Sequence, residues 1–153
     1  MILVASVIME DIRLIKDKTE LEGTCYFELL PGPYQDRCWN EQSVFMAEEV
    51  FGLLEPIFRR HVQQYDHFAF TEVAAERWTG IIHDLQRLRD KLAGAKSVDD
   101  VHGGLGFIWS TSETRFCNEF SSNSKSVVCV IDDLTTWLET VLGSQQVISI
   151  LGI

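Results

Sequence analysis

The residues best suited to chemistry form a short charged loop and a row of regularly spaced glutamates. Asp99, Asp100 and His102 fall in one tetrapeptide, just before a Gly-Gly pair. Carboxylates and an imidazole are ligands for divalent cations and groups that transfer protons. The pattern favours a charged surface loop bordered by glycines. The alternative is a small hydrolase or metal-dependent enzyme that uses His102 with the two aspartates.

The row consists of Glu41, Glu48 and Glu55, each seven residues from the next. Seven residues are almost two helical turns, so on one helix these carboxylates would follow a single flank and drift by about 20° per step. Such a row is typical of a solvated helix face. It also suits one side of an acidic surface that steers a basic protein into place.

The charge of the whole chain points to the same class of partner. Acids outnumber bases 23 to 13, which gives a net charge of −10. Residues 1–57 hold eleven acids and four bases, residues 58–98 hold five and seven, and residues 99–153 hold seven and two. This field repels nucleic acid and anionic membranes and attracts basic proteins.

The sequence contains no motif that names a reaction. Nucleophile elbows, phosphate-cradling loops, dinucleotide fingerprints and cysteine pairs with metal-type spacing are all missing from it. We therefore expect no cofactor and no catalytic activity. The expected role is binding to a basic protein, with no nucleic-acid or membrane partner.

An exposed aromatic side chain beside acids would complete a docking surface. Trp109 lies near a predicted turn and is freer to be exposed than Trp78 and Trp137, which fit helical core stripes. The predicted partner-binding residues are Glu41, Glu48, Glu55, Asp99, Asp100, Trp109, Glu113, Asp132 and Asp133. We expect a monomer or weak dimer. A homo-oligomeric adaptor domain with aromatics at a self-interface is a further alternative.

The elements that must position these residues belong to one domain, residues 1–153. The opening MILVASVIM has no basic residue after Met1 and reads as a first strand rather than a signal peptide, which favours a cytoplasmic protein with reduced cysteines. Residues 21–29 alternate as a strand with one buried face. That face carries Leu21, Cys25, Phe27 and Leu29. Cys25 and Cys129 lie in apolar runs and are predicted to be buried.

Helical spacing follows from residue 40 to about residue 65, with Asn40 as N-cap and a bend at Pro56. Phe68–Thr71 is either extended or a lead-in to a second helix from about 71 to 93, which ends at Gly94. Residues 105–110 and 114–120 predict a hairpin. The run 127–131 has strand propensity, but unbroken helical spacing favours a helix over 127–142, and 147–151 reads as a last strand. The predicted class is α+β, with helices packed on a mostly antiparallel sheet.

Three stretches of the chain carry a family resemblance: FAFTEVAAERWTGIIHDLQRLRDKL, GGLGFIWSTSETRF and VIDDLTTWLETVL. Over residues 68–142 they resemble the bacterial immunity proteins of polymorphic toxins, including contact-dependent growth inhibition systems. The resemblance implies a small cytosolic antidote that binds a cognate toxin domain, often a basic nuclease. It further implies stoichiometric occlusion of the toxin without turnover, and it assigns no individual site residue.

Overall fold

The computed structural model describes residues 11–153, so the strand predicted for the first nine residues lies outside the described part. Four strands form an antiparallel sheet in the order β2-β1-β4-β3. Their bounds are Tyr26–Pro31 for β1, Val44–Ala47 for β2, Phe70–Ala74 for β3 and Val147–Leu151 for β4. The strands predicted for 21–29 and 147–151 are thereby confirmed, the first with a shift of its bounds.

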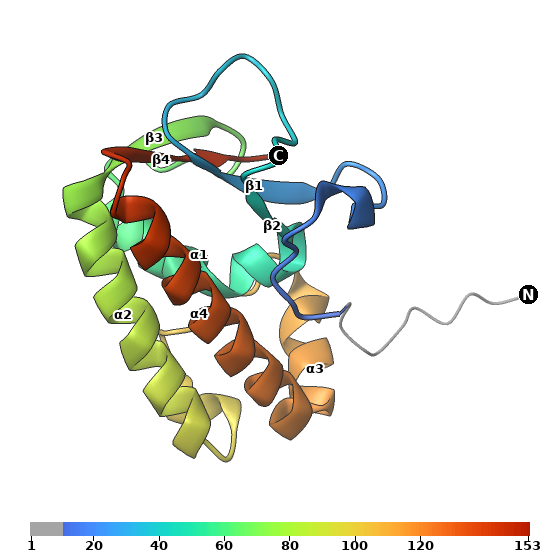
Figure 1. The fold of residues 1–153 in the computed structure, drawn as a ribbon. Helices are drawn as coiled ribbons and strands as arrows, with labels where there is room; N and C mark the ends of the chain where they lie inside the picture. The colour runs from blue at the N-terminus through green and yellow to red at the C-terminus, as the bar shows by residue number, and fades with distance from the viewer. Residues whose placement is uncertain (1–10) are drawn as a thin grey trace, which may run out of the picture.

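Four α-helices lie together on one side of this sheet (Figure 1). Their bounds are Glu48–His61 for α1, Ala75–Gly94 for α2, Ser110–Asn118 for α3 and Phe120–Leu142 for α4, with short 3-10 turns η1 at Lys18–Glu20 and η2 at Val98–Val101. Helices α2 and α4 lie side by side, and the loop between β1 and β2 arches over the other face of the sheet. The fold is α+β, as predicted. Within residues 11–153, no helix has the length and apolar composition needed to cross a bilayer.

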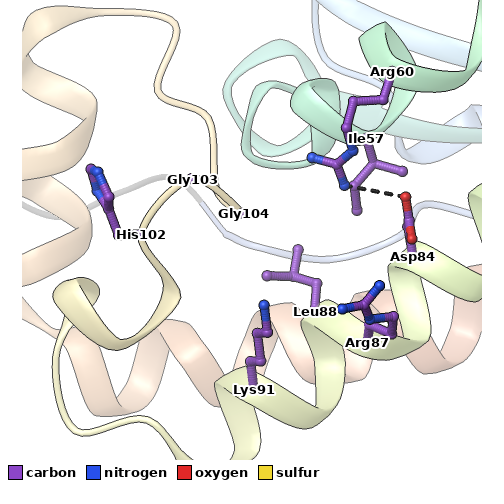
Figure 2. A pocket seen from close by; sticks show the side chains of 9 residues that line it. All are labelled: Ile57, Arg60, Asp84, Arg87, Leu88, Lys91, His102, Gly103 and Gly104. Carbon is purple, nitrogen blue, oxygen red and sulfur yellow. Dashed lines mark hydrogen bonds and ion pairs between the residues drawn. The ribbon is translucent and has the colours of Figure 1, made fainter.

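Polar contacts fix how α1 meets α2. Asp84 on α2 accepts a hydrogen bond from His61 Nε2 at 2.7 Å, at the end of α1. It accepts a second from Arg60 Nη2 at 3.3 Å, which Figure 2 marks with a dashed line. The hydrogen bond from His61, with a smaller contribution from Arg60, holds the pKa of the Asp84 carboxyl below its ordinary value.

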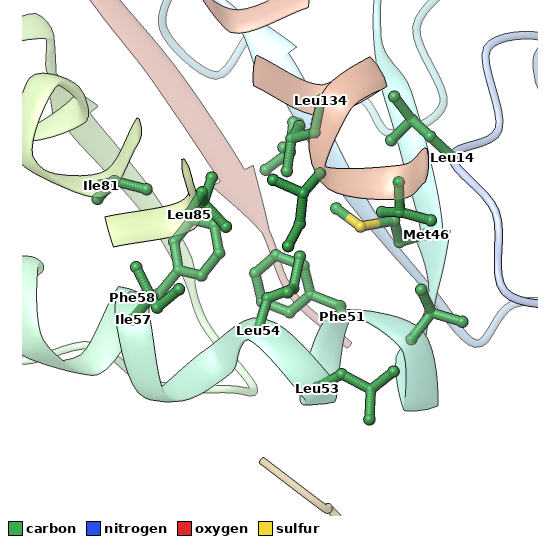
Figure 3. Packing of buried hydrophobic residues seen from close by; sticks show 14 of the residues in the cluster. Leu14, Met46, Phe51, Leu53, Leu54, Ile57, Phe58, Ile81, Leu85 and Leu134 are labelled. Carbon is green, nitrogen blue, oxygen red and sulfur yellow. The ribbon is translucent and has the colours of Figure 1, made fainter. Parts of the chain in front are cut away.

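The main core lies between the sheet and the helices. Strand alternation turns Phe27 and Leu29 toward the helices, where Phe27 stacks on Phe51 of α1 at 4.1 Å between ring centroids. Figure 3 shows α1 contributing apolar side chains on several sides, with Leu134 of α4 and Leu85 of α2 packed above them. Burial on this scale is the dominant favourable term in folding.

Helix α1 begins later than predicted. Asn40 is not its N-cap, because its side chain is buried and donates to Glu28 Oε2 at 2.9 Å. Glu28 is itself buried on the outer face of the sheet, where it also accepts hydrogen bonds from Ser43 and from the backbone N–H of Trp39. A carboxylate satisfied in this way organises the arching loop over the sheet. Residues 44–47, predicted as helix, instead pair with β1.

The predicted hairpin over 105–120 is wrong. Residues 110–118 form α3, and the hydroxyl of Ser112 accepts a hydrogen bond from the backbone N–H of Trp109 at 3.3 Å. Ser112 and Phe116 are both buried, and Phe116 packs edge-on against Phe120. Ser112, Phe116 and Phe120 follow one another at intervals of four residues, which is a helical period. The strand propensity of the aromatic and β-branched residues concealed this period.

The ambiguous run 127–131 is helical, which confirms the preferred interpretation, and α4 begins seven residues earlier. Gly143 is its C-cap. The prediction that Cys25 and Cys129 are buried is wrong, because all four cysteines are exposed free thiols. Helix α1 continues through Pro56, so proline does not end it.

Candidate functional site

An open groove of about 550 Å³ runs between α1 and the segment that precedes α3. We call it the aromatic groove. Its floor is polar, its rim carries exposed rings, and one wall is backbone. It is lined by Glu48, Gly52, Glu55, Pro56, Arg59, His67, Phe68, Gly106, Phe107, Ile108 and Trp109.

The floor is an imidazole held between two carboxylates. His67 Nδ1 contacts Glu55 Oε1, and His67 Nε2 lies 3.0 Å from Glu48 Oε2. Arg59 Nη2 reaches the other oxygen of Glu55 at 3.0 Å. The side chains of Glu55, His67 and Glu48 are only 4%, 12% and 14% exposed, so these contacts are shielded from water.

This arrangement limits the chemistry that His67 can perform. Each nitrogen–oxygen contact needs a proton between its two atoms, so the ring is either an imidazolium between two carboxylates or shares its protons with them. Neither nitrogen is left free to act as a general base toward a substrate. The cluster therefore suits positioning and binding better than proton transfer. Glu48 Oε1 has no hydrogen-bond partner among residues 11–153 and remains available to a donor from outside.

Helix geometry brings the two glutamates together. Glu48 and Glu55 are seven residues apart on α1 and so share one flank, as the sequence predicts. His67 reaches them from the turn between α1 and β3. Tyr65 from the same turn packs under Arg59, whose guanidinium carbon lies 5.2 Å from the ring centroid. Burial raises the pKa of the Tyr65 phenol, and the charge of Glu55 raises it further.

The backbone wall of the groove is set by a proline and two glycines. Pro56 has no N–H, so the carbonyl of Gly52 receives no helical hydrogen bond from it. Residues 102–109, which we call the crossing segment, pass at this point, and Gly106 N donates to Leu53 O at 3.0 Å. A Cβ on Gly106 would lie 2.5 Å from Gly52 O and 2.8 Å from Pro56 Cδ, so only glycine allows the approach. A Cβ on Gly52 would collide with Ile108 in the same way.

One side of the rim is Phe68, which is 72% exposed. Its turn is rigid, because Phe68 N donates to Asp66 Oδ1 at 2.9 Å and Ala69 N to Asp66 O at 3.1 Å. The last residues of the described chain add two further backbone hydrogen bonds, from Gly152 N to Ala69 O and from Ile153 N to His67 O. An exposed ring on an ordered turn loses little conformational freedom when it is buried by a partner.

A second ring on the rim is Trp109, which is 47% exposed, as the sequence predicted. Arg115 lies 5.8 Å from the Trp109 ring centroid and also reaches the buried Glu49 of α1, with Nη1 to Oε2 at 3.0 Å. These contacts fix the indole beside α1. Both rim rings are therefore held in place before any partner arrives.

The structure divides the predicted partner-binding residues into separate places. Glu48, Glu55 and Trp109 meet in the aromatic groove. Glu41 lies outside α1, exposed, with Oε1 3.8 Å from Lys18 Nζ, so the predicted row of three on one helix is wrong. Asp132 and Asp133 are exposed on α4, and Asp132 pairs with Arg89 of α2 at 3.1 Å.

Asp99 and Glu113 line a smaller hollow with His102. Asp100 instead caps η2, because its Oδ2 accepts from Lys96 N at 2.8 Å and from Ser97 N at 3.3 Å. Across the described chain, no group of three or more His, Cys, Asp or Glu side chains is placed to hold a metal ion. Asp99, Asp100 and His102 therefore do not form such a group.

Sequence reasoning missed the two residues that define the groove, His67 and Phe68. The available signal was weak, since His67 lies twelve residues after Glu55 and has no helical relation to it. Phe68 sits in an apolar run, Phe-Ala-Phe, that suggested burial.

Comparison with family models, with curated proteins and with solved structures finds no match to this chain.

Proposed function

We propose that this protein is a stoichiometric inhibitor that binds a basic toxin domain, in the manner of a bacterial immunity protein, and that the aromatic groove is the centre of its interface. The observation that carries the proposal is the pair of exposed rings, Phe68 and Trp109, that line the same groove as Glu48 and Glu55. Aromatic anchors of this kind dominate the energetics of protein interfaces.

Charge supports the same class of partner. A net charge of −10 attracts a cationic domain over long distances and disfavours acidic competitors. Within the groove, Glu48 Oε1 offers an acceptor to an arginine or lysine side chain that enters between the two rings. The alkyl stem of such a side chain would pack on the aromatic rim while its head group reaches the floor.

Occlusion requires no catalytic group, and the internal pairing of His67 with both glutamates is compatible with that role. The inhibitor would act by covering the active site or the nucleic-acid surface of the toxin. One molecule of inhibitor would neutralise one toxin domain, so protection would depend on relative expression.

The test is co-expression with a toxin domain encoded beside this gene. Cells that express the toxin domain should survive with the wild-type protein and die with the double variant Phe68→Ala/Trp109→Ala. Phe70→Ala is the matched control, because Phe70 is an exposed phenylalanine that does not line the groove. It should protect as well as wild type.

Two results would contradict the proposal. Equal cell death with and without the wild-type protein would remove the inhibitory role. Full protection by the double variant, at equal protein levels, would be consistent with an inhibitor but would exclude this groove as its interface.

Sedimentation of the protein alone tests self-association through the same rings, since a homo-oligomer should dissociate in the double variant.

A further inference from the structure

On the other flank of α1 lies a second hollow, of about 320 Å³, which we call the cationic pocket. Arg60 reaches it from α1, and Arg87 and Lys91 reach it from α2. Figure 2 shows the charged ends of these three side chains turned toward the same space, whereas His102 points away from it. Ile57 and Leu88 form an apolar floor beneath them.

The charge of this pocket is opposite to that of the molecule. Three cations line it against a single carboxylate, Asp84, which already pairs with Arg60 and His61. Arg87 and Lys91 have no ion-pair partner within residues 11–153, although acids outnumber bases in the chain. The pocket therefore carries an excess of about two positive charges.

The like charges of the cationic pocket repel one another. Arg87 and Lys91 are four residues apart on one helix, where like charges repel, and Arg60 faces them from the neighbouring helix. An anion placed among them would relieve this repulsion and accept hydrogen bonds from two guanidinium groups and one ammonium group. Because all three cationic side chains are exposed at their ends, an anion can reach them from solvent.

The chemistry of the pocket indicates the kind of anion. A phosphate monoester carries about −1.5 to −2 charges at pH 7, which matches the excess in the pocket better than a single carboxylate does. Its tetrahedral oxygens can be contacted from α1 and α2 at once. The apolar floor, Ile57 with Leu88, would pack against the organic part of the molecule, as is usual in small-molecule sites.

We propose that the cationic pocket is a binding site for a small organic phosphate monoester. The site is separate from the aromatic groove and does not depend on the inhibitor proposal. Arg60, Arg87 and Lys91 would hold the phosphate, and Ile57 and Leu88 would contact the remainder.

The test is a titration of the ¹⁵N-labelled full chain with phenyl phosphate, followed by NMR at constant ionic strength. Amide shifts should change at residues 87–91 and at Gly103 and Gly104, whose backbone borders the pocket. Sodium chloride and sodium benzoate are the comparison titrants. Phenyl phosphate should bind at least tenfold more tightly than benzoate.

Variants assign the binding to these side chains. Arg87→Gln/Lys91→Gln should weaken phenyl phosphate at least tenfold, and Asp84→Asn should strengthen it severalfold by removing the only carboxylate of the pocket. Arg77→Gln/Lys125→Gln is the matched control, because it removes two exposed cations that do not line the pocket and should leave the affinity unchanged.

Three outcomes would overturn the proposal: shifts no larger than those from chloride, equal binding of benzoate, or unchanged affinity in Arg87→Gln/Lys91→Gln. The double variant changes only two exposed side chains of α2, so it should fold normally. Its thermal unfolding provides the check. Failure of this test would leave the inhibitor proposal untouched, because the two sites are assayed with different partners.

Discussion

The aromatic groove and the cationic pocket lie on two flanks of the same helix, and their charged and apolar side chains are arranged in opposite ways. In the groove, the polar groups of Glu48, Glu55, Arg59 and His67 contact one another, and Phe68 and Trp109 are exposed at the rim. In the pocket, the floor is apolar, Arg60 pairs with Asp84, and Arg87 and Lys91 have no ion-pair partner among residues 11–153. The two proposals therefore call for different forces, namely apolar contact in the groove and electrostatic attraction in the pocket.

The two sites also share a wall. The crossing segment supplies Gly103 and Gly104 to the pocket and residues 106–109 to the groove. Its path depends on the contact of Gly106 with Gly52 and Pro56. A change in that contact should affect both sites, whereas changes at the floor of either site should remain local.

The largest effect on stability is expected from His67→Ala. It removes the partner of two carboxylates that are almost completely shielded, and breaking such a pair costs about 2–4 kcal/mol. Chemical denaturation should show this loss, while phenyl phosphate binding in the cationic pocket should not change. His83→Ala, an exposed histidine of α2, is the control and should lie near wild type. A neutral His67→Ala would contradict the account of the groove floor.

A smaller loss, of about 1–3 kcal/mol, is expected from Gly106→Ala. The added methyl group would meet the backbone carbonyl of Gly52 and the proline ring of Pro56, and neither group can turn aside. Amide shifts should change on both sides of α1 in an NMR spectrum. Gly94→Ala provides the comparison, because a Cβ there meets nothing within 4 Å. Changes confined to one side of α1 would show that the two sites do not share the crossing segment.

The next effect is pH-dependent and belongs to the cationic pocket. The pKa of Asp84 is lowered below its ordinary 3.8, first by the hydrogen bond from His61, so its ionised form stabilises the folded state. This stabilisation is complete above pH 3.8 and is lost as pH falls through the lower folded-state pKa. Asp84→Asn should therefore cost about 1 kcal/mol at pH 6, and the difference from wild type should shrink below pH 3.8. A difference that grows on acidification would contradict this assignment.

The smallest effect on stability is expected from Phe68→Ala. The ring is mostly exposed and its turn is held by backbone bonds, so the free energy of unfolding should change by no more than about 0.5 kcal/mol. Thermal and chemical unfolding should be indistinguishable from wild type. A loss above 2 kcal/mol would mean that Phe68 is part of the core and not an anchor for a partner.

Local patterns predicted those parts of the fold that depend on local spacing. Val147–Leu151 and the helical run from 127 to 142 follow from their own periodicity. Helix α3 was missed because Phe116 and its two threonines have high strand propensity, and its helical period becomes meaningful only when Phe116 is known to be buried. The separation of Glu48 from Glu55 predicted their shared flank correctly.

The candidate site could be predicted only in part. Glu48, Glu55 and Trp109 were identified by spacing and residue type, but their burial and pairing depend on His67, which is brought in by the turn after α1. The same applies to Arg60 and Arg87, which come from different helices and meet only through tertiary packing. Long-range contacts of this kind leave no periodic signal in the sequence.

The most direct test of the proposed inhibitory role is the affinity of the purified protein for a basic toxin domain taken from a neighbouring gene, measured by titration calorimetry. We expect one-to-one binding that weakens with salt, and a loss of at least thirtyfold in Phe68→Ala/Trp109→Ala, which corresponds to about 2 kcal/mol. Phe70→Ala should bind like wild type. Undiminished affinity in the double variant, or absence of binding by the wild-type protein, would contradict the assignment of the aromatic groove as the inhibitory interface.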